Sequence, residues 1–288
     1  MSRALIPAQR RQMIQNYLES HRVARLADLV DLLGTSEATV RRDLEWLEAQ
    51  GIAERTRGGA ILTQRLPTEP IFSASALFHP EEKDWIGRAA AARVQSDMTV
   101  FINSGTTTDA LLRHLRARVD LSNIILVTNN LRAAAELWEP GIEILILGGA
   151  YSGRAQSVVG RFAADMLRQL GADLAFIGVD GVSPKYGVTT PSTQEAEIGQ
   201  LMVSRTRGQV YIVADHSKWG VVSNYEIARL EQIHGLVVDT GLQAGPRTEL
   251  EARGLEVVLA GPDGEDTQSV GPIPREESAH APVWQEDR

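Results

Sequence analysis

The sequence predicts an α/β chain in two parts. A small, mainly helical N-terminal domain ends in a two-stranded ribbon, and a larger domain is built on a mostly parallel sheet. Three amphipathic segments and a glycine-rich turn occupy the first 62 residues. Beyond residue 80, short apolar strands alternate with amphipathic helices, a pattern typical of a parallel sheet that is covered on both faces.

The N-terminal domain, residues 1–62, is expected to contain three helices and a ribbon. Gly34 breaks the chain after the second helix, and Ser36 is a suitable N-cap for the third. The ribbon follows, with a turn over residues 57–59 between its strands. The helices are expected over Ala8–Ser20, Arg25–Leu33 and Glu37–Gln50.

The second and third of these helices, joined by a short turn that contains glycine, indicate a helix-turn-helix. If Val40 lies at the centre of the buried face of the third helix, Ala38, Arg42 and Glu45 point away from it. The small Ala38 lets this helix lie deep in a DNA groove, and Arg42 can pair with a guanine edge. Arg41 is better placed for phosphate. The residues expected to contact double-stranded DNA are Ser36, Glu37, Ala38, Thr39, Arg41, Arg42, Arg55 and Arg57, the last two on the ribbon, which acts as a wing.

The charge distribution restricts how nucleic acid can be bound. The net charge is −8, yet residues 1–62 hold nine arginines against eight acidic side chains. An acidic body repels DNA, so a chain that coats nucleic acid along its length is excluded and contact must come from a local arginine patch. The plainer alternative is a small helical domain whose arginines are only solvated.

Composition excludes several classes of site. The chain has no cysteine, which excludes disulfides, thiolate catalysis and cysteine-based zinc sites. We expect no metal and no cofactor. No apolar run approaches the roughly 20 residues that a membrane-spanning helix needs, and no signal peptide is recognisable at the start. A cytoplasmic protein without membrane contact is expected.

The rest of the chain is divided by composition. Residues 63–80 are expected to be a linker, because Pro67, Pro70 and Pro80 punctuate them. Residues 81–261 form the α/β domain, and residues 262–288, rich in Pro, Gly, Ser and acidic residues, are expected to be a disordered tail. The expected strands are Thr99–Asn103, Ile124–Thr128, Ile142–Leu147, Leu174–Val179, Val210–Ala214, Gly235–Val238 and Leu255–Leu259.

Four loops that follow predicted strands are candidates for a ligand site. They are Ser104–Thr108, Gly148–Tyr151, Asp180 with the Thr189 segment after it, and Asp215–Lys218. Ligands of parallel sheets bind beyond the carboxyl ends of the strands, and a helix N-terminus favours an anion. Each loop also has an ordinary interpretation as a helix cap, a turn or a solvent-facing lysine. Their shared sheet edge favours a common site.

At this point the motifs support a resemblance. The run SEATVRRDLEWLEAQG, with R-x-R-G-G-A after it, closely resembles the helix-turn-helix of the DeoR/GlpR family of bacterial regulators. Several later segments resemble the C-terminal sensor domain of that family: INSGTTTDAL, VTNN, LGGAYSG, AFIGVDGV, GVTTPSTQEAE and VADHSKWG. The resemblance spans about residues 5–240. It implies a Rossmann-like sensor domain that is similar in fold to ribose-5-phosphate isomerase and responds to phosphorylated sugars or polyols.

The resemblance also implies a set of effector-binding residues. A phosphate would be held by Ser104, Gly105, Thr106, Thr107 and Thr108. The remaining pocket would be lined by Asn129, Gly149, Asp180, Thr189, Glu195 and Lys218. Many members carry aspartate where Asn103 stands, so this chain has one negative charge fewer near the expected phosphate.

The resulting expectation is a homo-oligomeric regulator of transcription, a dimer or tetramer, that represses carbohydrate-metabolism genes under control of a phosphorylated metabolite. One alternative is a sugar-phosphate isomerase with an accessory DNA-binding domain, in which Asp180, Glu195 and Lys218 supply acid, base and electrostatic stabilisation. No paired carboxylates at tight spacing support that chemistry. Another alternative is a module that binds a second protein.

Overall fold

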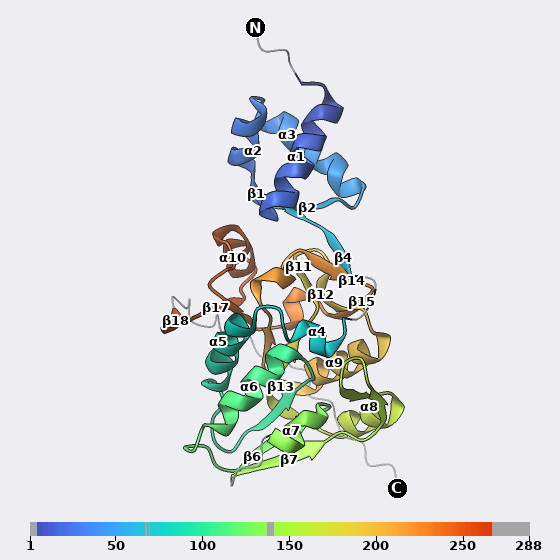
Figure 1. The fold of residues 1–288 in the computed structure, drawn as a ribbon, viewed down its shortest axis with the longest axis vertical. Coiled ribbons are helices and arrows are strands. Elements are labelled where there is room, and N and C mark those ends of the chain that lie inside the picture. Colours follow the sequence, from blue (N-terminus) through green and yellow to red (C-terminus); the bar gives the residue numbers. More distant parts are fainter. Residues whose placement is uncertain (1–4, 67, 69, 137–140, 267–288) are drawn as a thin grey trace, which may run out of the picture.

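The computed structural model describes residues 5–66, 68, 70–136 and 141–266. The N-terminal domain stands at one end of the α/β domain, and the β3–β4 segment leads from one to the other (Figure 1). The predicted architecture, a winged helix-turn-helix followed by a mostly parallel α/β domain, is confirmed. Among the described residues, no helix combines the length and apolar character needed to cross a membrane.

The N-terminal domain follows the predicted order with one added strand. Its elements are α1 (Pro7–His21), β1 (Val23–Arg25), α2 (Leu26–Leu33), α3 (Glu37–Ala49), β2 (Ala53–Thr56) and β3 (Gly59–Leu62). Gly34 ends α2 in the left-handed region at φ 57°, and the Ser36 hydroxyl caps α3 by accepting the Thr39 N–H. The added strand β1 pairs with β3, so α2 begins one residue later than expected and the wing has three strands.

The α/β domain is organised around an eight-stranded sheet. In spatial order its strands are β18 (Gly264–Asp266), β17 (Glu256–Gly261), β16 (Gly235–Asp239), β13 (Thr206–Val213), β10 (Ala172–Gly178), β5 (Thr99–Ile102), β6 (Ile124–Thr128) and β7 (Ile142–Ile146). All neighbours are parallel except β17 and β18. Following the chain, β6 and β7 are added toward one edge of the sheet from β5, whereas β10, β13, β16 and β17 are added toward the other edge. The strand order therefore reverses between β5 and β10, where ligands bind in open α/β sheets.

Helices cover both faces of this sheet, as the buried strands predict. They are α5 (Pro80–Ala91), α6 (Thr106–Arg116), α7 (Leu131–Glu136), α8 (Arg161–Arg168), α9 (Thr193–Arg205) and α10 (Ala244–Glu251). Successive strand residues point to opposite faces, so Phe101 and Ile177 belong to one buried cluster while Ile102 and Phe176 belong to the other. Two apolar layers thus hold the carboxyl ends of β5 and β10 in place.

Smaller elements surround the sheet edge at which β5 and β10 end. They are α4 (Phe72–Ser75), the hairpin of β8 (Ala150–Ser152) and β9 (Ser157–Val159), the sheet of β11 (Gly181–Ser183), β12 (Gly187–Thr190) and β15 (Tyr225–Ala228), and the short helices η1 (His216–Lys218) and η2 (Leu230–Gln232). Strand β4 (Gln64–Leu66) pairs in parallel with β14 (Val221–Ser223).

Two predictions about the segments around the α/β domain need correction. The expected linker, residues 63–80, contains β4, α4 and the start of α5. The prolines of this segment indicate a linker, and the partner strand of β4 lies about 150 residues away in sequence, so no local pattern predicted the pairing. The tail expected to be disordered from Pro262 begins with β18, which pairs antiparallel with β17. The remainder of that tail, residues 267–288, lies outside the described residues.

Candidate DNA interface and candidate ligand cleft

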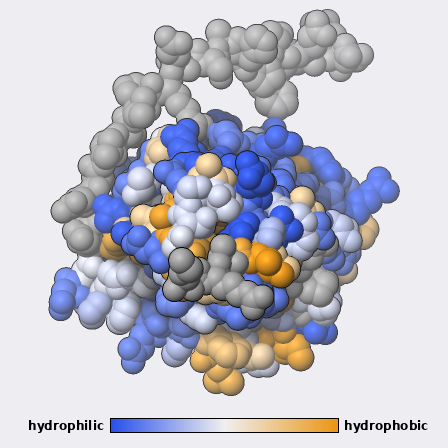
Figure 2. Space-filling view, turned by 90° about the horizontal axis from the view of Figure 1, so that it is seen from above, coloured by the Kyte–Doolittle hydropathy of each residue, from blue (hydrophilic) through white to orange (hydrophobic). Residues whose placement is uncertain are grey.

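The outward face of α3 has the composition that the sequence predicts. Ala38, Arg42 and Glu45 are exposed, whereas Val40 is fully buried. Within the described part of the chain, the Arg42 side chain has no hydrogen-bond or ion-pair partner. Figure 2 looks onto the end of the molecule that carries this domain and shows hydrophilic residues over most of the visible surface. The geometry leaves Arg42 free to meet a base edge without first breaking an internal bond.

The other predicted DNA-contacting arginines differ in their surroundings. Arg41 forms an ion pair with Glu37 one turn earlier, and Arg55 on β2 forms one with Glu45 of α3 at 2.9 Å. Arg57, in the β2–β3 turn, is exposed, and its side chain is unpaired within the described ranges. Arg41 and Arg55 must therefore exchange a carboxylate for a phosphate on binding, whereas Arg57 need not. Ser36 and Thr39 share a hydrogen bond at the start of α3.

A buried ion-pair cluster that sequence reasoning missed fixes α3 on α1. The Asp43 side chain, 3% exposed, accepts hydrogen bonds from the guanidinium groups of Arg10 at 2.7 Å and Arg11 at 3.0 Å. Arg11 also lies over the ring of Trp46, 4.4 Å from its centroid. An acidic residue among the exposed charges of a helix gives no sequence signal of such burial. The cluster therefore joins α3 to α1 by charged as well as apolar contacts.

A cleft of about 710 Å³, counting its open mouth, lies beyond the carboxyl ends of β5 and β10. At its base the Asn103 side chain joins the two strand ends. Its amide donates to the Gly178 carbonyl at 2.9 Å, and its carbonyl oxygen accepts the Gly178 N–H at 2.7 Å. An ionised aspartate could not donate the first of these bonds. Asn103 therefore joins β5 to β10 at the point where the strand order reverses.

The loop after β5 forms one wall of the cleft. Ser104, Gly105, Thr106 and Thr107 line it at the N-terminus of α6. Backbone N–H groups in the first turn of a helix lack intrahelical partners, so this end attracts an anion. Thr108 is fully buried and does not line the cleft; its hydroxyl donates to the Gly105 carbonyl at 2.9 Å. It holds the loop closed over α6.

Charged groups from three separate segments also line the cleft. Asp180, Glu195 and Lys218 all line the cleft. Burial raises the pKa of Asp180, an effect that Lys218 and a hydrogen bond from the Thr190 hydroxyl at 2.9 Å oppose. Glu195 accepts hydrogen bonds from the hydroxyls of Ser104 and Ser157. The cleft thus combines a cation and helix N–H groups with two carboxyl groups that can accept hydrogen bonds from hydroxyl groups.

Three other predicted residues do not line the cleft. Asn129 is fully buried behind the wall, and its side-chain oxygen, Oδ1, accepts the Ser104 N–H at 2.9 Å. The Thr189 hydroxyl accepts the Ser223 N–H at 3.0 Å on the far side of β12, and Thr190 lines the cleft in its place. Gly149 lies beside β9, where a Cβ atom would come within 2.7 Å of the Val159 carbonyl oxygen. Asn129 also donates its side-chain amide to the Val158 carbonyl at 3.1 Å, so it joins the Ser104 loop to β9 behind the cleft.

Part of the cleft comes from the segment expected to be a linker. Pro70, Phe72 and Ser75 line it. The Lys83 ammonium group, in a side chain that is almost fully buried, donates to the carbonyls of Ser75 at 2.7 Å and Phe78 at 2.6 Å and so fastens α4 over the site. Burial lowers the pKa of Lys83, which nearby Asp215 partly opposes. The sequence did not predict the burial of Lys83, because a lone lysine is usually exposed.

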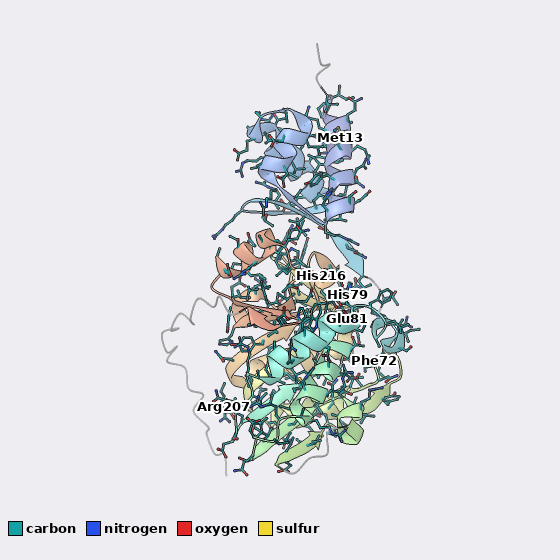
Figure 3. All side chains as sticks on the ribbon, turned by 60° about the vertical axis from the view of Figure 1, so that its left-hand side comes forward. Met13, Phe72, His79, Glu81, Arg207 and His216 are labelled. Carbon is teal, nitrogen blue, oxygen red and sulfur yellow. The ribbon has the colours of Figure 1, made fainter. Side chains whose placement is uncertain are left out.

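A histidine–aspartate pair supports the turn that presents Lys218. His216 in η1 forms an ion pair with Asp239 at the end of β16, with 2.8 Å between the Nδ1 and Oδ2 atoms. The Asp239 side chain raises the pKa of His216, and although burial opposes ionisation of Asp239, the His216 hydrogen bonds lower its pKa. His79 meets His216 edge to face, and Figure 3 shows both near the end of the α/β domain that faces the N-terminal domain.

Family models match both parts of the chain. The model described as DeoR-like helix-turn-helix domain matches residues 10–65, and that described as DeoR C terminal sensor domain matches residues 78–240. The chain belongs to the DeoR family. Helix α3 accordingly lies within the DeoR-like helix-turn-helix domain, and most of the cleft lining lies within the DeoR sensor domain.

Relatives of similar length support this assignment to the DeoR family. The HTH-type transcriptional regulator GlpR of Haloferax volcanii is 34% identical, with 88% of this chain and 98% of that protein covered. The HTH-type transcriptional repressor GlcR of Bacillus subtilis is 33% identical, with 87% and 95% covered. A solved D-ribose-5-phosphate isomerase in complex with phospho-erythronic acid is 19% identical, with a TM-score of 0.37, and the match covers 49% of this chain and 54% of that one.

This DeoR-family chain is a DNA-binding transcription regulator and not an enzyme, since its close curated relatives are named as regulators. The isomerase alternative is therefore set aside. Within the part of the chain that the structure describes, no group of three or more acidic or histidine side chains is arranged to hold a metal ion. The cleft has the features of a binding site for an organic anion with hydroxyl groups.

Proposed function

We propose that this regulator represses carbohydrate-metabolism genes and that a phosphorylated sugar or polyol, bound in the cleft between β5 and β10, controls its affinity for an operator. The observation that carries the proposal is the position of the cleft, which lies at the reversal of strand order and is lined by both the N-terminus of α6 and Lys218. Names of relatives, such as the transcriptional repressor GlcR, support repression as the direction of control.

The chemistry of the two walls supports the ligand class. A phosphate group would lie against Thr106 and Thr107 at the helix N-terminus, where N–H donors and hydroxyls gather. The carboxyl groups of Asp180 and Glu195 would accept hydrogen bonds from sugar or polyol hydroxyls. Two carboxyl groups in one cleft disfavour a purely anionic ligand, so a molecule with both a phosphate and hydroxyl groups fits better than phosphate alone.

A thermal-shift screen of phosphorylated sugars and polyols tests this proposal. A ligand present at about 100 times its Kd stabilises a folded protein by about 2.7 kcal/mol, which raises the melting temperature measurably. Any compound that binds is then added to a titration of the operator. If no phosphorylated sugar or polyol shifts the melting temperature, and the purified chain instead retains a protein partner through this domain, the proposal is wrong and the interaction-module alternative holds.

Replacement of Lys218 by alanine is expected to weaken binding of the phosphorylated ligand by about 10- to 150-fold, because one hydrogen bond to a charged group contributes about 1.5–3 kcal/mol. Isothermal titration of wild type and variant measures the change. Arg161→Ala is the control, since Arg161 is an exposed cationic residue that does not line the cleft. Equal affinity in the two variants would show that Lys218 does not contact the phosphate.

We further propose that the chain acts as a dimer or tetramer on an operator with two half-sites. One DNA-reading module has a small interface, and two modules related by symmetry read sites about 10 base pairs apart or a multiple of that spacing. Mass measurement by light scattering at micromolar concentration checks the assembly. A monomer that protects only one half-site would contradict it.

A further inference from the structure

A carboxylate of the wing is buried against the sensor domain. The side chain of Glu54 on β2 is almost fully buried, and it accepts hydrogen bonds from the Ser183 hydroxyl and the Lys185 backbone N–H. Burial raises the pKa of Glu54, and both hydrogen bonds oppose that rise. A buried carboxylate is costly even when it is hydrogen-bonded, and an apolar residue would join two domains at lower cost. The place of the two hydrogen-bond donors, Ser183 and Lys185, in the fold therefore matters.

The two donors belong to a hairpin whose other end reaches the cleft. Ser183 ends β11 and Lys185 lies in the turn before β12, while Thr190 at the far end of β12 donates its hydroxyl to Asp180 in the cleft wall. The Asp180 N–H donates to the Thr189 carbonyl at 3.1 Å, so the same hairpin end is fastened by backbone as well. One short hairpin, three residue pairs long, therefore reaches the cleft at one end and the wing at the other.

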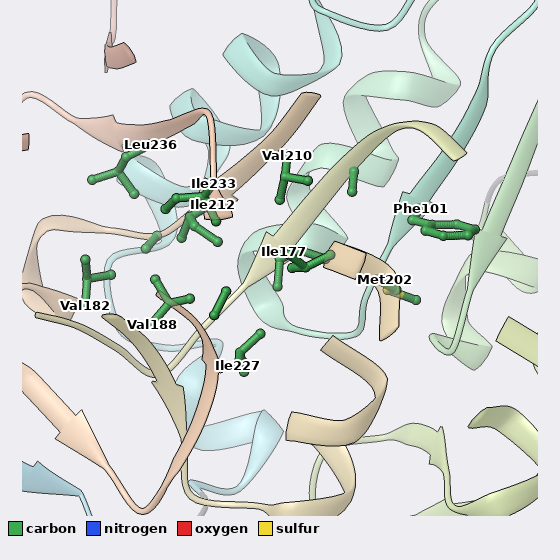
Figure 4. Packing of buried hydrophobic residues seen from close by; sticks show 14 of the residues in the cluster. Phe101, Ile177, Val182, Val188, Met202, Val210, Ile212, Ile227, Ile233 and Leu236 are labelled. Atoms are coloured by element: carbon green, nitrogen blue, oxygen red, sulfur yellow. The ribbon is translucent and has the colours of Figure 1, made fainter. Parts of the chain in front are cut away.

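The hairpin is packed closely enough to move as one piece. Val182 and Val188, side by side on β11 and β12, are buried in the large apolar cluster and lie near Ile212 and Ile227 in Figure 4. At Gly181 a Cβ atom would come within 2.2 Å of the Val221 carbonyl oxygen, so β11 lies directly against β14. A displacement at Thr190 is consequently carried to Ser183 rather than absorbed in a loop.

Strand β2 is also attached to α3, the helix expected to read DNA. Arg55, next to Glu54, points to the opposite face of the strand, forms an ion pair with Glu45 and donates its N–H to Glu48 at 3.2 Å. Both acidic residues are on α3. The sequence of contacts therefore runs from the cleft through the hairpin to Glu54, and from β2 to the helix that enters the groove.

We propose that Glu54 is a positioning residue that transmits occupancy of the cleft to the DNA-reading module. This inference rests on the proposed function, because it gives the route by which the ligand would change operator affinity. A ligand that hydrogen-bonds Asp180 and Thr190 shifts the hairpin, changes the two hydrogen bonds of Glu54 and turns β2 with α3. By linkage, DNA bound to α3 must in turn change the stability of the hairpin.

The test uses this reverse effect, which requires no identified ligand. The probe is a DNA duplex selected from a random pool by the full chain, and the readout is amide hydrogen exchange of residues 181–190 with and without saturating duplex. In wild type the duplex is expected to change exchange in this segment by about fivefold or more. Glu54→Ala and Ser183→Ala, which lose both acceptors and one donor respectively, are expected to bind the duplex without this change in exchange.

Two further variants separate transmission from simple loss of structure. Glu249 also joins the domains, because its carboxylate accepts the Arg57 N–H at 3.3 Å, but it lies on α10 away from the hairpin. Glu249→Ala is expected to keep the exchange response. Glu54→Gln, which can still accept from Lys185, is expected to restore most of it. Pairing of β4 with β14 holds the domains together in every variant.

The outcomes distinguish this inference from the proposed function. A full exchange response in Glu54→Ala and Ser183→Ala, or no response in wild type, overturns the role of Glu54 and leaves the ligand proposal standing. If no phosphorylated compound stabilises the chain but the exchange response depends on Glu54, the ligand proposal fails and Glu54 still couples the domains. Loss of the response in Glu249→Ala as well would show a general loosening of the interface, which also overturns the inference.

Discussion

Arg42→Ala is expected to lower operator affinity by about 1–3 kcal/mol, which is roughly 5- to 150-fold, and to relax base preference at one position of the site. The Arg42 side chain is exposed on the outward face of α3 and is unpaired within the described residues, so it gives up no internal bond when it meets a base. A bidentate arginine–guanine pair also carries information on sequence, which a phosphate contact does not. Binding-site selection followed by titration measures both effects.

Arg57→Ala is the matched control for Arg42. Arg57 is also exposed and unpaired within the described ranges, but it lies in the turn of the wing, where a phosphate is the expected partner. Its removal should weaken binding evenly across sequences and reduce the slope of log affinity against log salt by about 0.9. An unchanged base preference in Arg42→Ala would show that another residue of α3 reads the base.

Asp43→Ala is expected to destabilise the N-terminal domain by about 2–4 kcal/mol, because it leaves two arginines without their buried partner. The loss of unfolding free energy should be smaller than the largest values found when buried ion pairs are broken, because the Arg10 and Arg11 side chains are 15% and 25% exposed and can turn partly toward water. Marginal stabilities of about 5–15 kcal/mol make a change of this size large. Urea unfolding followed by circular dichroism measures it, and operator binding should fall with it.

Glu37→Ala provides the comparison for Asp43. It breaks the ion pair with Arg41 on the same helix, but both side chains are largely exposed, at 58% and 46%. Exposed pairs one turn apart contribute about 0.3–0.5 kcal/mol, so its unfolding midpoint should barely change. If Asp43→Ala proves equally harmless, the angle of α3 is set by apolar packing alone.

Local patterns predicted most of the N-terminal domain and seven of the eight strands of the large sheet, but not the spatial order of those strands. The spacing of Val40, Leu44 and Leu47 determined which side of α3 is buried, and the Gly34 and Ser36 pair marked the turn before it. Strand β1 was missed because three residues carry no periodic signal of their own. It forms only because β3 presents a free edge to it.

The candidate cleft was predicted as a set of loops but not residue by residue. Thr189 and Thr190 are equivalent in sequence, and only the pairing of β12 shows that Thr190 faces the cleft, since a shift of one residue exchanges the two faces of a strand. Asn129 and Thr108 lie behind the cleft wall, because the side chain of each forms a hydrogen bond with the loop that lines the cleft, and Asn129 bonds to β9 as well. Phe72 and Ser75 came from a segment without any periodic pattern.

The sequence by itself determined the two-part architecture, the family and the outward face of α3, because these depend on periodicity and capping within a few turns of chain. Only the tertiary structure decided how the parts are joined. Asp43 pairs with residues more than 30 positions away, and Glu54 meets Ser183 from 129 positions away. A buried hydrogen bond requires both groups at one point in space, and that condition is set by the packing of the whole chain rather than by either residue's neighbours in sequence.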